Sequence, residues 1–150
     1  MKTLNKPIAA ATALCALMTG AALAQAATPL PPVQRSGTVA YLSGGIGVDE
    51  SKGIQNASKQ RPLTLEFVIK DKRRADFAAG VAVKVHDAKG HAVLDTTAGG
   101  PFLLAKLPPG RYAVDATLAG KTLHAAVKVE SGRPARTLLV WPAGTDGTRS

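Results

Sequence analysis

The chain has 150 residues, of which 45% are apolar and 19% are charged, a composition typical of one globular domain. Its formal net charge is +9, and a single cysteine excludes an internal disulfide framework. The length excludes a multidomain enzyme. With 15 Gly and 10 Pro against 4% aromatic residues, we expect many turns around a core of Val, Leu and Ala.

The N-terminal residues have the organisation of a secretory signal peptide. Lys2 and Lys6 precede an apolar run over residues 8–23, and the run ends in small residues at the spacing that signal peptidases accept. We therefore predict that residues 1–24 are cleaved, with cleavage after Ala26 as the alternative. The run is shorter than the roughly 20 residues that cross a bilayer, which argues against a membrane anchor. The predicted localisation is periplasmic or secreted.

Cys15 lies in the middle of this apolar run, directly after Leu14, and not at its end behind a small residue. A lipid-attachment site is therefore not indicated. Cleavage at the predicted position removes the cysteine together with two lysines, so the mature protein has no thiol and a formal charge of +7.

The next segments change character within a few residues. Residues 25–37 contain three prolines and predict a flexible leader. Residues 38–61 begin with a short alternating strand around Tyr41, which a Gly-rich turn over residues 43–47 ends. A polar stretch over residues 49–60 follows, and it predicts at most one short helix.

From residue 62 to residue 141 apolar and polar residues alternate with period two, which predicts strands. Gly and Pro turn signals separate these strands, at residues 87–90, 107–110, 119–121 and 131–134. We therefore expect an all-β fold, an antiparallel β-sandwich of seven or eight short strands, with an up-and-down barrel as the alternative. Residues 142–150 are expected to form a disordered tail.

The alternation also predicts which side chains are buried. Residues 101–107 are apolar on both faces, which indicates a strand in the middle of the sandwich. Lys84 and Lys128 should lie outside. The predicted core consists of Leu65, Phe67, Val83, Val85, Phe102, Leu104, Tyr112, Val114 and Val127.

The segment around the turn at residues 107–110 resembles a known family. The residues that carry the likeness are Gly100, Phe102, Leu107, Pro108, Gly110, Tyr112 and Val114, with the hairpin over residues 81–90 upstream. Their order is similar to that of carboxypeptidase regulatory-like domains, which have the transthyretin-like, or prealbumin-like, β-sandwich. The resemblance covers residues 62–141 and implies an accessory module for binding or packing.

One branch of this fold, the hydroxyisourate hydrolases, is enzymatic and ends in Tyr-Arg-Gly-Ser. This chain ends differently, so the resemblance implies no hydrolase activity. His86 and His91 flank a predicted hairpin turn and could approach each other, but they form no metal-ligand motif with His124. No Ser/His/Asp arrangement is recognisable either. We expect no catalytic residue, no metal and no cofactor.

The basic residues Lys70, Lys72, Arg73 and Arg74 stand close together between two predicted strands. One interpretation is a solvated loop; the other is an anionic contact, with an acidic lipid surface, an acidic glycan or an unknown protein as partner. The export signal and the lack of interleaved aromatic residues argue against nucleic acid.

These observations together predict an exported, non-catalytic binding or interaction module of undetermined ligand. It would not span the membrane after cleavage. A transthyretin-like hydrolase or metal-assisted enzyme is one alternative. A structural partner protein that pairs through an edge strand is the other.

Overall fold

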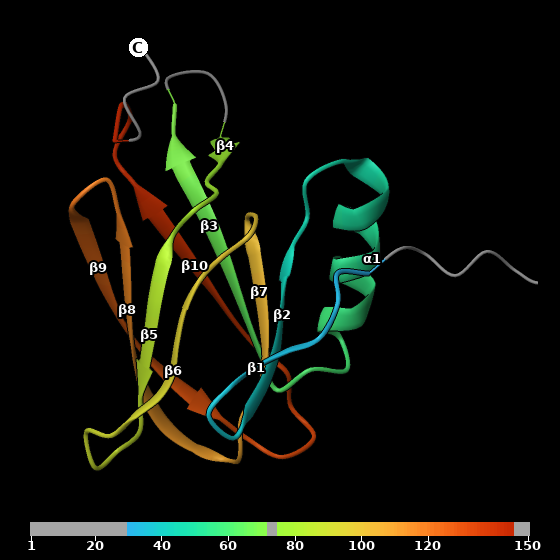
Figure 1. Cartoon of the computed structure of the whole chain (residues 1–150), viewed down its shortest axis with the longest axis vertical. Helices are drawn as coiled ribbons and strands as arrows, with labels where there is room; N and C mark the ends of the chain where they lie inside the picture. The colour runs from blue at the N-terminus through green and yellow to red at the C-terminus, as the bar shows by residue number, and fades with distance from the viewer. Residues whose placement is uncertain (1–29, 72–74, 146–150) are drawn as a thin grey trace, which may run out of the picture.

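A computed structural model describes residues 30–71 and 75–145. Two β-sheets pack face to face, and one helix lies on the outer side of one of them (Figure 1). The predicted all-β sandwich with one short helix is confirmed, and the barrel alternative is wrong. The predicted signal peptide and residues 72–74 of the basic run lie outside the described residues.

The two sheets divide the described chain as follows. Sheet A has the strand order β1-β2-β7-β3-β10, with β4 also paired to β3, and sheet B has the order β6-β5-β8-β9. Sheet A consists of β1 (Gln34–Ser36), β2 (Val39–Gly44), β3 (Leu63–Lys70), β4 (Ala75–Phe77), β7 (Phe102–Lys106) and β10 (Ala135–Trp141). Sheet B consists of β5 (Ala82–His86), β6 (Ala92–Thr97), β8 (Gly110–Leu118) and β9 (Lys121–Val129), and the helix is α1 (Val48–Ser58).

The main core lies between the inner faces of the two sheets. Because successive side chains of a strand point to opposite faces, the period-two apolar residues of β3, β5, β8 and β9 all meet there. Trp141 of β10 is fully buried and packs against Phe67 with ring centroids 6.2 Å apart. All nine predicted core residues are buried, and Lys84 and Lys128 are exposed, as predicted.

A second, smaller core lies between sheet A and α1. Phe102 and Leu104 of β7 are buried here with Leu42 of β2 and Ile54 of α1, not between the sheets. The residue that alternates with them, Leu103, faces the main core. The double-sided apolar pattern of residues 101–107 therefore has a specific cause: β7 is covered by the other sheet on one face and by α1 on the other.

One strand pairing departs from the antiparallel prediction. β10 pairs with β3 in parallel, with Ala135 opposite Leu63 and Trp141 opposite Ile69. The connection from β9 crosses from sheet B to sheet A at the end of the sandwich where β3 begins, so β10 runs in the same direction as β3 (Figure 1).

The hairpin between β5 and β6 turns where the sequence predicts it. The carboxylate oxygen Oδ1 of Asp87 accepts the backbone N–H groups of Lys89 and His91, both at 2.9 Å. Gly90 adopts a φ of 82°, which an L-residue rarely adopts. The backbone N–H of His91, and to a lesser degree that of Lys89, holds the pKa of Asp87 below its usual value.

The segment between β7 and β8, where the Pro-Pro-Gly sequence predicts a turn, joins strands of different sheets. The segment therefore crosses over the end of the sandwich. Pro109 followed by Gly110 is typical of a type II turn with a left-handed glycine. That expectation is wrong here, because Gly110 has a φ of 158°, close to extended, and already starts β8. The hydroxyl of Tyr112 donates a hydrogen bond to the carbonyl of Pro108 at 2.6 Å and fixes the crossover.

Both predicted flexible ends contain ordered residues. In the leader, Gln34–Ser36 form β1, and the hydroxyl of Tyr41 donates to the Gln34 side chain at 3.0 Å. In the tail, Thr145 is buried, and its hydroxyl donates to the carbonyl of Pro142 at 2.6 Å. Among the described residues, no helix has the length and apolar character needed to cross a membrane.

Candidate functional site

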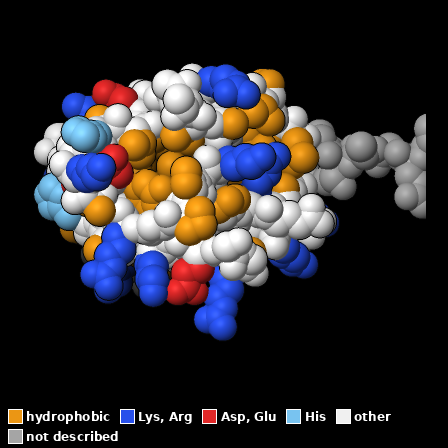
Figure 2. All heavy atoms as spheres, turned by 90° about the horizontal axis from the view of Figure 1, so that it is seen from below, with side chains coloured by type: hydrophobic (Ala, Val, Ile, Leu, Met, Phe, Trp, Pro, Cys, Tyr) orange, Lys and Arg blue, Asp and Glu red, His pale blue; other side chains and the backbone are white. Residues whose placement is uncertain are grey.

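Three connections that are distant in the sequence meet at the lower end of the sandwich in Figure 1. They join α1 to β3, β7 to β8 and β9 to β10, and they enclose a cleft of about 270 Å³, which we call the end cleft. Its apolar lining consists of Pro62, Leu107, Pro109, Val129 and Pro134, and its cationic rim consists of Lys59, Arg61 and Arg133. Figure 2 views this end and shows hydrophobic side chains at its centre with Lys and Arg side chains around them.

Each wall of the end cleft is tied to the sandwich. The backbone N–H of Ala135 donates to the carbonyl of Pro62 at 2.9 Å, which joins the α1–β3 connection to the start of β10. Tyr112 holds the β7–β8 crossover, and burial raises the pKa of its hydroxyl, which stays protonated and keeps donating. The β9–β10 connection closes on itself through a backbone bond from Arg133 to Glu130 at 3.3 Å. The cleft is therefore largely preformed.

The charges around the end cleft are predominantly positive. The acidic residue in the lining of the cleft is Glu130, whose carboxylate pairs with Lys128 at 3.0 Å and with Arg133 at 3.7 Å. Within the described part of the chain, Lys59 and Arg61 form no ion pair, so no carboxylate offsets their charge. Two more cations stand at the same strand ends: Lys106 is the last residue of β7, and Arg111 is the second residue of β8.

This arrangement suits a ligand that is both anionic and partly apolar. The exposed cations attract a negative group over a distance of about 10 Å at moderate salt. The proline-lined floor offers apolar contact at fixed geometry, because proline has little conformational freedom to lose.

Sequence reasoning missed the end cleft because its cations, at positions 59, 61 and 133, come from segments far apart in the chain. Lys59 and Arg61 follow α1, whereas Arg133 lies between β9 and β10. No sequence motif predicts that these cations lie close together, because their proximity depends on three connections that cross one end of the sandwich. The sequence itself showed only the basic cluster over residues 70–74, whose members are neighbours in the chain.

Of that predicted anionic contact, the structure describes Lys70. It is the exposed last residue of β3, at the upper end of the sandwich in Figure 1, opposite the end cleft. Lys72, Arg73 and Arg74 lie outside the described residues, so the contact stays a prediction.

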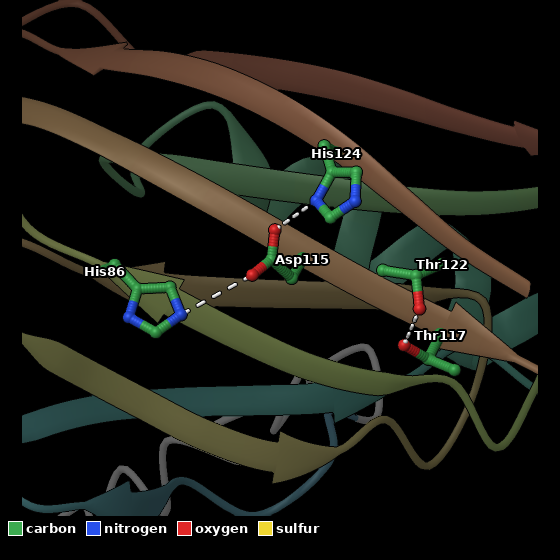
Figure 3. Close-up of polar contacts among 5 residues, drawn as sticks. All are labelled: His86, Asp115, Thr117, Thr122 and His124. Atoms are coloured by element: carbon green, nitrogen blue, oxygen red, sulfur yellow. Dashed lines mark hydrogen bonds and ion pairs between the residues drawn. The ribbon is translucent and has the colours of Figure 1, made fainter. Parts of the chain in front are cut away.

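The three histidines lie on sheet B and its hairpin. His86 of β5 and His124 of β9 both point to Asp115 of β8, with Nε2 3.5 Å from Oδ2 and Nδ1 2.5 Å from Oδ1 respectively (Figure 3). His91, which the sequence places as a possible neighbour of His86, instead lies 3.6 Å from Asp87. A β-bulge between Val85 and His86 ends the regular pairing, and His86 is directed across to β8.

The His86–Asp115–His124 array is an open surface feature. Its three side chains lie on the outer face of sheet B, and that of His124 is 74% exposed. Within residues 30–71 and 75–145, no group of three His, Cys, Asp or Glu side chains has a geometry that could hold a metal ion. The end cleft has no histidine in its lining. The array links the adjacent strands β5, β8 and β9. The hydroxyls of Thr117 and Thr122, which contact each other nearby, link β8 and β9.

A scan of the chain against models of known protein families finds no match, and a search of curated proteins finds no similar sequence.

Proposed function

We propose that this protein is an exported, non-catalytic binding module, periplasmic or secreted, whose end cleft binds an anionic partner. The observation that carries the proposal is the convergence of Lys59, Arg61 and Arg133 around a preformed apolar hollow. An acidic glycan, an acidic lipid surface or an acidic protein segment would each supply the required negative charge.

The positions of the charged and titratable side chains support the proposal of a binding role. The end cleft combines cations with apolar walls, whereas the histidines and Asp115 stand on an open sheet face away from it. An enzyme needs its acid, base and binding groups to converge on one substrate. The sequence resemblance to carboxypeptidase regulatory-like domains, which act as accessory modules, also favours a binding role.

Binding at the end cleft should be weak and sensitive to salt. Arg133 is 83% exposed, so it remains hydrated and acts mainly through long-range attraction. Raising the salt concentration shortens the screening length and weakens that attraction. The apolar floor adds a contribution that salt does not screen.

The test compares double charge reversals with heparin as an acidic-glycan probe. Arg61→Glu with Arg133→Glu changes the end cleft, and Lys84→Glu with Lys121→Glu is the control on sheet B. Both variants replace two positive charges with two negative ones, so their net charges are equal. We expect the end-cleft variant to lose heparin binding at least tenfold more than the control, in titrations at low salt. Circular dichroism checks that both variants are folded.

A third reversal, Arg73→Glu with Arg74→Glu, separates the end cleft from the predicted basic loop. If it alone abolished binding, the anionic contact would belong to the loop and the end-cleft proposal would be wrong. Equal losses in all three variants would mean that the overall charge, and not a site, attracts the polyanion. Vesicles of phosphatidylcholine with phosphatidylglycerol, used as a second probe, distinguish a lipid surface from a glycan.

A further inference from the structure

The helix covers only part of the outer face of sheet A. α1 packs over β2 and β7 through Ile54, and β3, β4 and β10 lie beyond it. On that uncovered part, the strand register places Val140 of β10 beside Val68 of β3, and Val68 beside Phe77 of β4. Val140 is 42% exposed and Phe77 57% exposed, whereas Val68 between them is only 6% exposed, so two exposed apolar side chains flank a buried one across three neighbouring strands.

This row of apolar side chains continues to the turn between β2 and α1. Phe77 and Val48, the first residue of α1, line a groove of about 500 Å³. Ile46 and Val48 are each 69% exposed, and Leu138 of β10 extends the row at its other end with 55% exposure. We call the exposed residues Ile46, Val48, Phe77, Leu138 and Val140 the apolar strip. Of the seven exposed large hydrophobic residues in the described chain, five belong to the strip.

The turn that carries Ile46 is firmly braced. The hydroxyl of Ser43 donates to the carbonyl of Phe102 and accepts the N–H of Gly99, both at 2.9 Å. The carboxylate of Glu50 accepts the N–H of Gly45 at 2.7 Å. Close packing adds to this, because a Cβ on Gly100 would lie 2.4 Å from the backbone of Gly44. The exposed aliphatic side chains are thus held outward by a rigid turn, which lowers the entropic cost of binding.

We propose that the apolar strip binds a second copy of this chain. The chain without its predicted signal peptide has a formal charge of +7, so most of its surface repels another copy. Beside the strip, Glu66 of β3 and Arg136 of β10 form an ion pair with each other, so each offsets the charge of the other. In a two-fold arrangement, Arg136 of each copy can also meet Glu66 of the other, since an isologous interface brings the same patch from both copies together.

The expected association is modest. The strip has far fewer residues than the roughly 20–30 per side of a standard stable interface, so monomers should predominate in dilute solution and dimers in concentrated solution. Burial of apolar side chains drives it, so high salt should leave it intact. Salt weakens binding of an anionic partner to the end cleft, which makes the two proposals experimentally separable.

The test is sedimentation of the purified protein over a range of concentrations, at low and at high salt. Leu138→Ser with Val140→Ser changes the strip. Leu30→Ser with Val33→Ser is the matched control, because these residues are also exposed aliphatics but lie before β1. We expect the parent protein and the control to dimerise with rising concentration at both salt levels. The strip variant should dimerise at least tenfold more weakly.

A second strip variant, Ile46→Ser with Val48→Ser, tests the opposite end of the strip in case the β10 changes disturb folding. A parent protein that stays monomeric at the highest concentration overturns the proposal. So does a strip variant that is folded, by thermal melting, and dimerises as well as the control. Dimerisation that disappears at high salt would also contradict it, because it would point to charge and not to apolar burial.

Discussion

At the scale of single residues, the turn between β8 and β9 contains an unfavourable backbone conformation. Ala119 has a φ of 47° and Gly120 a φ of 79°, the two positive angles of a type I′ hairpin turn. Glycine adopts such angles freely, whereas alanine is strained by about 1 kcal/mol. The alanine is tolerated because the paired strands on either side fix the turn.

Ala119→Asn should therefore stabilise the protein by roughly 0.5–1 kcal/mol, since asparagine tolerates the left-handed region and favours this turn position. Urea denaturation measures the change. The matched control is Ala126→Asn on an exposed, extended position of β9, which should give no gain. A gain at both positions would show that the effect does not come from the turn.

Asp87 provides a pH-dependent prediction at the same scale. Its pKa is lowered in the folded protein, chiefly by the N–H of His91, so the ionised form is the one that the hairpin stabilises. The contribution is present above the ordinary carboxyl pKa of about 3.9 and is lost as the pH falls through the lower folded value. Asp87→Ala should destabilise the protein at neutral pH, and the difference from the parent should shrink below about pH 4. A difference that is the same at all pH values would contradict this account.

At the scale of elements, α1 and β7 depend on each other. β7 is apolar on both faces because α1 covers one of them, and Ile54 is the fully buried contact of the helix. Period-two patterning predicted the strands and the burial of Phe102, because alternation depends only on local backbone geometry. It could not show that Phe102 packs under a helix, since the covering element lies elsewhere in the chain. The parallel β3–β10 pairing escaped prediction for a similar reason: it depends on a crossing between sheets.

Ile54→Ala should cost about 2–5 kcal/mol of stability and Phe102→Ala about 3–5 kcal/mol, from lost burial and the cavity left behind. Val114→Ala should cost a comparable few kcal/mol in the main core. Lys84→Ala, on the exposed face of β5, should change stability by less than about 0.5 kcal/mol. Chemical denaturation gives all four values. If Ile54→Ala were as mild as Lys84→Ala, the helix would not form the second core.

At the scale of the whole molecule, export remains a prediction from the sequence. We expect the mature protein to start at Gln25 or at Ala27, after one of the two small-residue sites. Intact-mass measurement of the exported protein decides between them. A mass that retains residues 1–24, or a lipid adduct on Cys15, would show that the segment is not a cleaved secretory signal.

The candidate site also belongs to this scale, which is why the sequence could not locate it. The end cleft exists because three connections cross one end of the sandwich and bring Arg61 close to Arg133. The sequence shows the excess of positive charge and predicts an anionic partner, but it points to the contiguous run that begins at Lys70. Only the folded chain shows that cations from separate segments surround an apolar hollow.

The most direct test of the end-cleft proposal is to map heparin binding on the protein by NMR, through the backbone amide shifts of each residue during a titration. The proposal predicts that the largest shifts cluster at the end cleft, at Arg61, Val129 and Arg133, and that they become smaller as salt is added. Shifts centred on Lys70 and Phe77, or spread evenly over both sheets, would contradict it.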